Sequence, residues 1–112
     1  MELSTAVEYK IPVTVVILNN YGWVSIRDLQ IRGLKNRRFG TEFKKLADFE
    51  KLVTSYGANY SRAEDPQSFR RSLRNALRSR SVSVVETIVE RRFPKDSTYM
   101  YGYWDIPTPY RS

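Results

Sequence analysis

The chain has 112 residues, of which 41% are hydrophobic and 28% charged; its formal net charge is +7, and it contains neither cysteine nor histidine. This length allows a single domain with one core, and the missing residue types exclude disulfides and remove the commonest general base and metal ligand. No apolar run approaches the ~20 residues of a membrane span, and the acidic, amphipathic start is unlike a secretory signal, so the sequence predicts a cytoplasmic protein.

The chain opens with a predicted helix followed by a predicted strand. Apolar residues recur at helical spacing over residues 3–7, and this helix should end near Lys10 because Pro12 disfavours helical backbone before it. The β-branched run of residues 13–18 then predicts a strand buried on both faces, as in a parallel sheet. A turn at residues 19–22 follows at the carboxyl end of the strand, the edge where open α/β sheets bind ligands.

Two further helices are predicted in the middle of the chain. The apolar spacing from Trp23 to Leu34 indicates the first of them, followed by a basic, glycine-containing loop over residues 33–40. Asp48 suits the N-cap of the next helix, which has one apolar face, and Gly57 suits its C-terminal end.

A second strand–helix–strand unit follows. Residues 59–63 are a weak strand candidate, and Asp65 with Pro66 marks a helix start, because proline suits the first helical position. That helix should bury an apolar stripe formed by Phe69, Leu73, Ala76 and Leu77. The apolar, β-branched residues 82–89 predict another buried strand.

Helices and strands alternate, which predicts an α/β fold with a parallel sheet flanked by helices. We expect this domain to span residues 1–92. Residues 93–112 are rich in aromatic residues and prolines but show no periodicity. We therefore expect an extended C-terminal tail that lies over an apolar surface of this chain or of a partner.

Several short motifs follow one another in a particular order. The first predicted strand is entered through Ile-Pro-Val and ends in two amides, Asn19 and Asn20. Later blocks are residues 21–30, which include an aliphatic-Arg-x-x-Gln pattern, and then residues 40–43, 48–58, 64–66 and 84–86. Together they resemble the thiamine-diphosphate-binding domain of the acetolactate synthase and 2-oxoacid decarboxylase superfamily, whose cofactor motif opens with Gly-Asp-Gly and closes with Asn-Asn.

The resemblance implies a site in which Mg²⁺, or a similar hard cation, bridges protein oxygens to the diphosphate of thiamine diphosphate. The metal ligands would be the amide oxygen of Asn20 and the main-chain oxygen of Gly22. Trp23 and Ile26 would border the cofactor, and Ile26 with Leu29 would shape a substrate pocket. The residues alone leave other roles open: an asparagine caps backbone groups in such a turn, a glycine tolerates positive φ, and Trp23, Ile26 and Leu29 pack as one core face.

The chain also departs from the family pattern. It lacks the Gly-Asp-Gly half of the motif, whose aspartate holds the metal, and the pyrimidine-binding domain, whose glutamate activates the cofactor. No catalytic residue is therefore assigned to it. Acetolactate synthases usually carry tryptophan at the position of Leu29, and simple 2-oxoacid decarboxylases carry glutamate at that of Ile26.

We therefore expect a C-terminal fragment or subunit of a thiamine-diphosphate-dependent, acetolactate synthase-like enzyme, acting in 2-oxoacid decarboxylation or carboligation only when the enzyme is complete. Its expected partner is a complementary chain or a second copy, because an incomplete sheet exposes an edge and an apolar face. The alternative is a non-catalytic basic α/β module that binds nucleic acid or an acidic partner through Arg70, Arg71, Arg74 and Arg78. No groove-reading motif supports nucleic acid. An inactive remnant with a stable fold is a third possibility.

Overall fold

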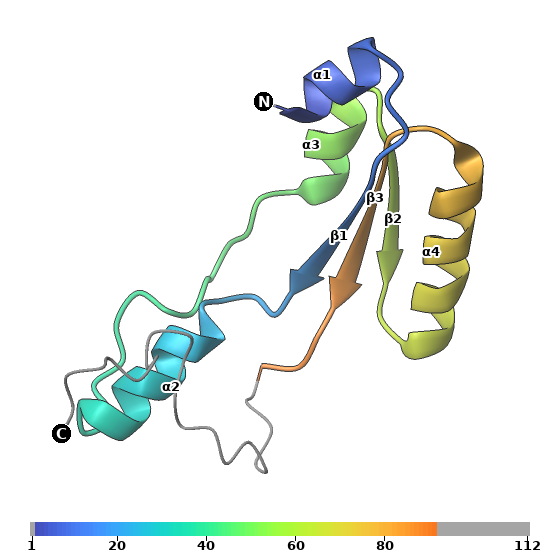
Figure 1. The fold of residues 1–112 in the computed structure, drawn as a ribbon. Coiled ribbons are helices and arrows are strands. Elements are labelled where there is room, and N and C mark those ends of the chain that lie inside the picture. Colours follow the sequence, from blue (N-terminus) through green and yellow to red (C-terminus); the bar gives the residue numbers. More distant parts are fainter. Residues whose placement is uncertain (1, 92–112) are drawn as a thin grey trace, which may run out of the picture.

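The structure of the protein, a computed structural model, describes residues 2–91 apart from the side chain of Arg32. The described helices and strands are α1 (Glu2–Glu8), β1 (Thr14–Asn19), α2 (Val24–Gly33), α3 (Phe49–Ser55), β2 (Asn59–Ala63), α4 (Pro66–Ser79) and β3 (Ser83–Ile88) (Figure 1). Across these residues every helix is too short or too polar to cross a bilayer. The predicted tail of residues 93–112 and the predicted domain end at residue 92 lie outside the described residues.

The three strands form one parallel sheet in the order β1-β3-β2, so the last strand in sequence lies in the centre. Asn19 at the end of β1 pairs with Ile88 of β3, and Ala63 at the end of β2 pairs with Thr87. The carboxyl ends of all three strands therefore meet at the same edge. This arrangement confirms the predicted parallel α/β fold, including its weak strand candidate.

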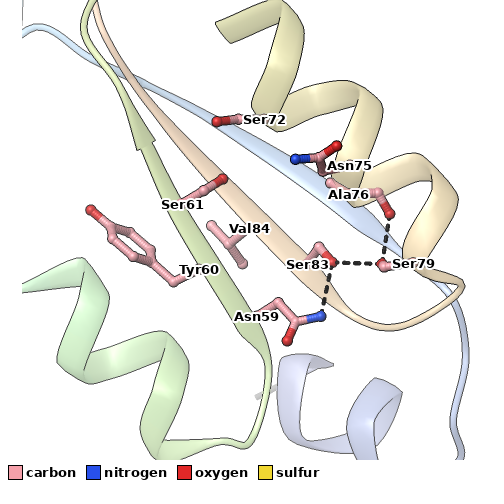
Figure 2. A pocket seen from close by; sticks show the side chains of 9 residues that line it. All are labelled: Asn59, Tyr60, Ser61, Ser72, Asn75, Ala76, Ser79, Ser83 and Val84. Carbon is pink, nitrogen blue, oxygen red and sulfur yellow. Dashed lines mark hydrogen bonds between the residues drawn. The ribbon is translucent and has the colours of Figure 1, made fainter. Parts of the chain in front are cut away.

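Helices cover both faces of the sheet. On one face, α1 and α3 pack over a small core whose buried residues are Ala6, Val53, Ala58, Val82 and Val84. On the other face lies α4 (Figure 1). The alternation along β2 is visible in Figure 2, where Tyr60 points to the side of α3 and Ser61 points toward α4.

The predicted helix ends follow local signals in the sequence. The Asp48 side chain accepts a hydrogen bond of 3.0 Å from the N–H of Lys51 in the first turn of α3. Gly57, which follows α3, has a φ of 79°, a conformation that glycine adopts without strain. Asp65 caps α4 by accepting from two N–H groups at 2.8 and 2.9 Å, and Pro66 is the first helical residue. Both N-caps are confirmed.

Two burial predictions are wrong. The strand β1 is not buried on both faces: Val15, Val16 and Leu18 are 38%, 39% and 67% exposed, because β1 is an edge strand of the described sheet. In α4, Ala76 is buried as expected, but Leu77 is 65% exposed. One residue further along a helix is a rotation of about 100°, which turns Leu77 away from the sheet that Ala76 contacts.

Candidate functional site

The turn after β1 is held by its own side chains. The Asn19 side-chain oxygen accepts a hydrogen bond of 2.9 Å from the N–H of Tyr21, and the Asn20 side-chain oxygen accepts one of 3.3 Å from the N–H of Gly22. Asn20 thus caps the backbone, as its residue type alone suggests. An amide oxygen has two lone pairs, so this hydrogen bond leaves one of them for a cation.

Gly22 is needed because another segment approaches its backbone. It forms an isolated antiparallel bridge with Glu42. The residues on either side of Gly22 make the hydrogen bonds of this bridge, and one of these bonds, 2.9 Å long, runs from the N–H of Trp23 to the carbonyl oxygen of Thr41. A Cβ at Gly22 would lie 2.4 Å from that carbonyl oxygen. Gly22 does not adopt a positive φ, which was the other reason expected for a glycine here. Among the described glycines, only Gly40 and Gly57 adopt a positive φ.

Between the two predicted metal ligands lies Tyr21, which adopts a left-handed backbone with φ of 57°. Its ring lies 5.1 Å from the guanidinium carbon of Arg91, and its hydroxyl accepts a hydrogen bond of 2.9 Å from Arg62. Arg91 also donates to the main-chain oxygen of Asn20 at 3.2 Å. The neighbouring Glu64 carboxylate, and then the Tyr21 hydroxyl, raise the pKa of Arg62, which stays charged. Arg91, together with Arg62 in its ion pair with Glu64, therefore places guanidinium groups beside the turn, which favour an anionic ligand.

Beneath the turn lies a buried carboxylate that sequence reasoning missed. Glu86, in the central strand, is 3% exposed and accepts hydrogen bonds from the Asn19 side-chain amide and the Tyr60 hydroxyl. Burial, together with this carboxylate, raises the pKa of Tyr60, so the hydroxyl remains a donor. A single acid inside the apolar run of residues 82–89 was the available signal, because a buried charge requires hydrogen-bond partners.

The side chains predicted to border the cofactor are exposed. Trp23, Ile26 and Leu29 are 60%, 40% and 53% exposed, and α2 stands away from the sheet (Figure 1). Their interpretation as core residues is therefore wrong; among the described side chains of α2, Val24 is buried, at 7%. Trp23 packs edge-to-face against Phe43 with ring centres 5.8 Å apart. An exposed apolar stripe of α2, formed by Ile26 and Leu29, thus continues from Trp23.

The two predicted metal ligands, the Asn20 side-chain oxygen and the Gly22 main-chain oxygen, are neutral oxygens. Within residues 2–91, no group of three or more His, Cys, Asp or Glu residues could hold a metal ion. Asn20 and Gly22 are both partly buried, so their oxygens are neither sealed in the core nor fully in solvent. A cation at this turn would need negative charge from its ligand, or from groups outside the described residues.

A pocket of about 230 Å³ lies elsewhere, between α4 and the sheet (Figure 2). Its lining includes Asn59 and Ser83, the first residues of β2 and β3, and Ser79 at the end of α4. It therefore lies at the amino ends of the strands, at the opposite edge from Asn20, and does not belong to the turn.

This fold and sequence are shared with known enzymes. A 4-hydroxybenzoylformate decarboxylase of Rhodococcus jostii RHA1, described as thiamine diphosphate-dependent, matches with a TM-score of 0.71 and 25% identity over 79% of this chain and 16% of that chain. A 3D-(3,5/4)-trihydroxycyclohexane-1,2-dione hydrolase of Lacticaseibacillus casei is 32% identical over 94% of this chain and 17% of its own length. The acetolactate synthase large subunit of Haemophilus influenzae is 35% identical over 68% of this chain and 13% of its own length.

The chain thus spans only 13–17% of the length of these relatives. Residues 1–87 match the family described as thiamine pyrophosphate enzyme, C-terminal TPP binding domain, where thiamine pyrophosphate is another name for thiamine diphosphate. The chain therefore belongs to the thiamine pyrophosphate enzymes and carries the C-terminal TPP-binding domain of that family.

Proposed function

We propose that this chain provides part of the Mg²⁺ and diphosphate site of a thiamine-diphosphate-dependent enzyme. The observation that carries the proposal is the turn after β1: in a chain of this family, the Asn20 side chain and the Gly22 backbone are tied together at the carboxyl edge of a parallel sheet. The Asn20 side-chain oxygen and the Gly22 main-chain oxygen would bind the cation, because Mg²⁺ takes oxygen ligands.

The remaining residues of the site would bind and orient the cofactor. Arg62 and Arg91 would add positive charge beside the diphosphate, and the exposed Trp23 and Ile26 would border the cofactor. Leu29 would extend this apolar wall toward a substrate. Thiamine diphosphate, when bound, supplies the electron sink for breaking or forming a carbon–carbon bond beside a carbonyl, and the protein supplies binding and shielding.

We infer that the complete enzyme acts in the cytoplasm on 2-oxoacids, by decarboxylation or carboligation. The relatives include a decarboxylase and an acetolactate synthase, and this chain corresponds to about one sixth of their length or less. The other ligands and the pyrimidine-binding part would come from sequence beyond these 112 residues. The exposed edge strand β1, with Leu18 67% exposed, offers the place where a complementary segment or a second copy would add.

The test is a calorimetric titration with thiamine diphosphate, in Mg²⁺ and in EDTA. We expect saturable binding only with Mg²⁺, and a Kd raised roughly 10–100-fold in Asn20→Ala, which removes a metal-binding oxygen. Asn75→Ala is the matched control, because Asn75 is an exposed asparagine of α4 far from the turn. Its Kd should equal that of the unchanged chain.

Binding that is the same in EDTA, or that Asn20→Ala leaves unaltered, would contradict the metal-ligand role. Absence of binding by the unchanged chain would show that the turn does not hold the cofactor unaided. The titration would then be repeated with the 112 residues extended by a Gly-Asp-Gly segment taken from a relative. Failure of the extended chain as well would rule out the proposal.

A further inference from the structure

The helix α4 carries a row of like charges. Arg70, Arg74 and Arg78 follow one another at intervals of four residues, so they lie on one side of the helix, and all three are exposed. No aspartate or glutamate occurs within Pro66–Ser79 to offset them. Like charges at this spacing repel one another, so the row favours a negatively charged partner.

These arginines differ from other basic side chains of the protein. Several basic residues outside α4 form ion pairs with carboxylates: Arg27, Arg38, Lys51 and Arg62. The side chains of the three arginines form no ion pair or hydrogen bond with any residue in the part of the chain that the structure describes. Their charge is therefore available to a ligand.

An apolar strip runs beside the arginine row. Figure 2 shows Ser72, Ala76 and Ser79 on the side of α4 that faces the sheet. At about 100° per residue, Leu73 and Leu77 project from the flank of the helix, between the side facing the sheet and the arginines. Strip and row together form one surface that lies wholly on α4, made mainly by Phe69, Arg70, Leu73, Arg74, Leu77 and Arg78. We call it the α4 surface.

We propose that the α4 surface binds an amphipathic helix of a partner protein whose apolar face is bordered by aspartate or glutamate. Such a helix would cover the strip with its apolar side chains and pair its carboxylates with the arginines. Leu77, which is 65% exposed, would then become buried. Helices commonly pack against one another in this way, through rows of side chains three and four residues apart.

Two other anionic partners fit the α4 surface less well. Nucleic acid binds basic surfaces through its phosphates and would not need the apolar strip. A flat anionic membrane would meet the arginines first, because the helical rotation of about 100° per residue places them further from the sheet-facing side of α4 than the leucines. A helix that lies along α4 contacts strip and row together. The proposal is independent of the cofactor site, which lies on the turn after β1.

The test uses a fluorescent synthetic helical peptide with leucine on one face and glutamate on both borders, titrated with the 112-residue chain. Arg70→Gln, Arg74→Gln and Arg78→Gln in combination should raise the Kd roughly tenfold or more, because three charge pairs are lost. The matched control is Arg37→Gln, Lys44→Gln and Lys45→Gln, which removes three exposed charges from the loop before α3. This control should change the Kd no more than about twofold, through net charge alone.

A second pair of variants tests the apolar strip. Leu77→Ser should weaken peptide binding several-fold, whereas Leu18→Ser, at a leucine of equal exposure on β1, should not. Both side chains are already exposed, so both variants should fold, which thermal unfolding would verify. The proposal would be overturned if the triple arginine variant of α4 and the control variant of Arg37, Lys44 and Lys45 changed the Kd equally. It would also be overturned if a single-stranded oligonucleotide or phosphatidylglycerol vesicles bound more tightly than the peptide and Leu77→Ser did not change that binding.

Discussion

The carboxylate of Glu86 connects the central strand to the turn that carries the candidate site. Its two oxygens accept from the Asn19 amide and the Tyr60 hydroxyl, so one buried group orients residues from all three strands. The side-chain oxygen of Asn19 accepts a hydrogen bond from the N–H of Tyr21. Glu86 would therefore position the turn without contacting metal or cofactor.

Substitutions at Glu86 should separate hydrogen bonding from charge. Glu86→Ala leaves the buried Asn19 amide and the partly buried Tyr60 hydroxyl without this acceptor and should lower the free energy of unfolding by about 1–3 kcal/mol. Glu86→Gln should be milder, because the amide oxygen can face Asn19 while its NH₂ group donates to the Tyr60 oxygen. Urea unfolding of both variants measures this difference, and equal losses would show that the negative charge itself is required.

Gly22 and Gly33 give a second contrast at the scale of the residue. Gly22→Ala should cost about 1–3 kcal/mol, because its Cβ would meet the Thr41 carbonyl at 2.4 Å and displace that segment. Gly33→Ala, at the end of α2, meets no atom within 4 Å and should be neutral or slightly stabilising. Chemical unfolding compares the two, and a neutral Gly22→Ala would mean that the bridge to Glu42 shifts freely.

Among the elements, α4 has the most complete set of end signals. Asp65 accepts from the first turn, the Ser68 hydroxyl contacts the N–H of Asp65, and Pro66 occupies the first helical position. The hydrogen bonds from Ser68 hold the pKa of Asp65 below its ordinary value. The charged form of the cap therefore stabilises the folded helix.

This lowered pKa sets a pH dependence. Asp65→Ala should lower the thermal midpoint by roughly 4–8 °C at neutral pH. Because the folded pKa lies below the unfolded value of about 3.9, the stabilisation is complete above that pH and is lost as the pH falls through the folded pKa. Melting curves of the two proteins should converge in strong acid. Gln67→Ala, in the same turn, is the control and should leave the pH profile unaltered.

The ends of the helices were predictable from the sequence, whereas the burial or exposure of the helices and strands was not. Asp48, Gly57 and Asp65 act on backbone groups within a few residues, so their effect can be recognised without knowledge of the fold. The exposure of β1 depends on its place at the edge of the sheet, and its apolar run is as long as that of the central β3. Composition alone does not distinguish an edge strand from a central one.

The candidate site shows the same division. Asn20 and Gly22 were identified through a resemblance carried by short motifs, and the structure places them in one turn. The support of the turn by Glu86 could not be predicted, because it joins residues 67 positions apart and depends on strand register. Likewise, the close approach of Thr41 to Gly22 involves a loop without periodicity.

The molecule as a whole has a core of small side chains. Every buried hydrophobic residue in residues 2–91 is alanine or valine, whereas larger hydrophobic residues such as Leu18, Trp23 and Leu77 are well exposed. So much exposed apolar surface is unusual for a monomer and is typical of a surface that packs against other protein. The edge of β1 adds unpaired backbone groups to this surface.

We therefore expect the isolated chain to associate with itself in a concentration-dependent way. Leu18→Lys places a charge on the exposed edge strand and should shift the mass measured by light scattering toward the monomer. Thr5→Lys, which adds the same charge at an exposed position of α1, should leave the mass unaltered. A chain that is monomeric at all concentrations would contradict this expectation.

The central position of β3 also governs the order in which the protein can assemble during synthesis. Neither β1 nor β2 has a strand to pair with until residues 83–88 leave the ribosome, since both bond only to β3 in the described sheet. Until then the β-branched run of β1 remains unpaired, and contacts of such long sequence separation form slowly. During synthesis, β1 is therefore without its β3 partner while residues 20–82 are being made.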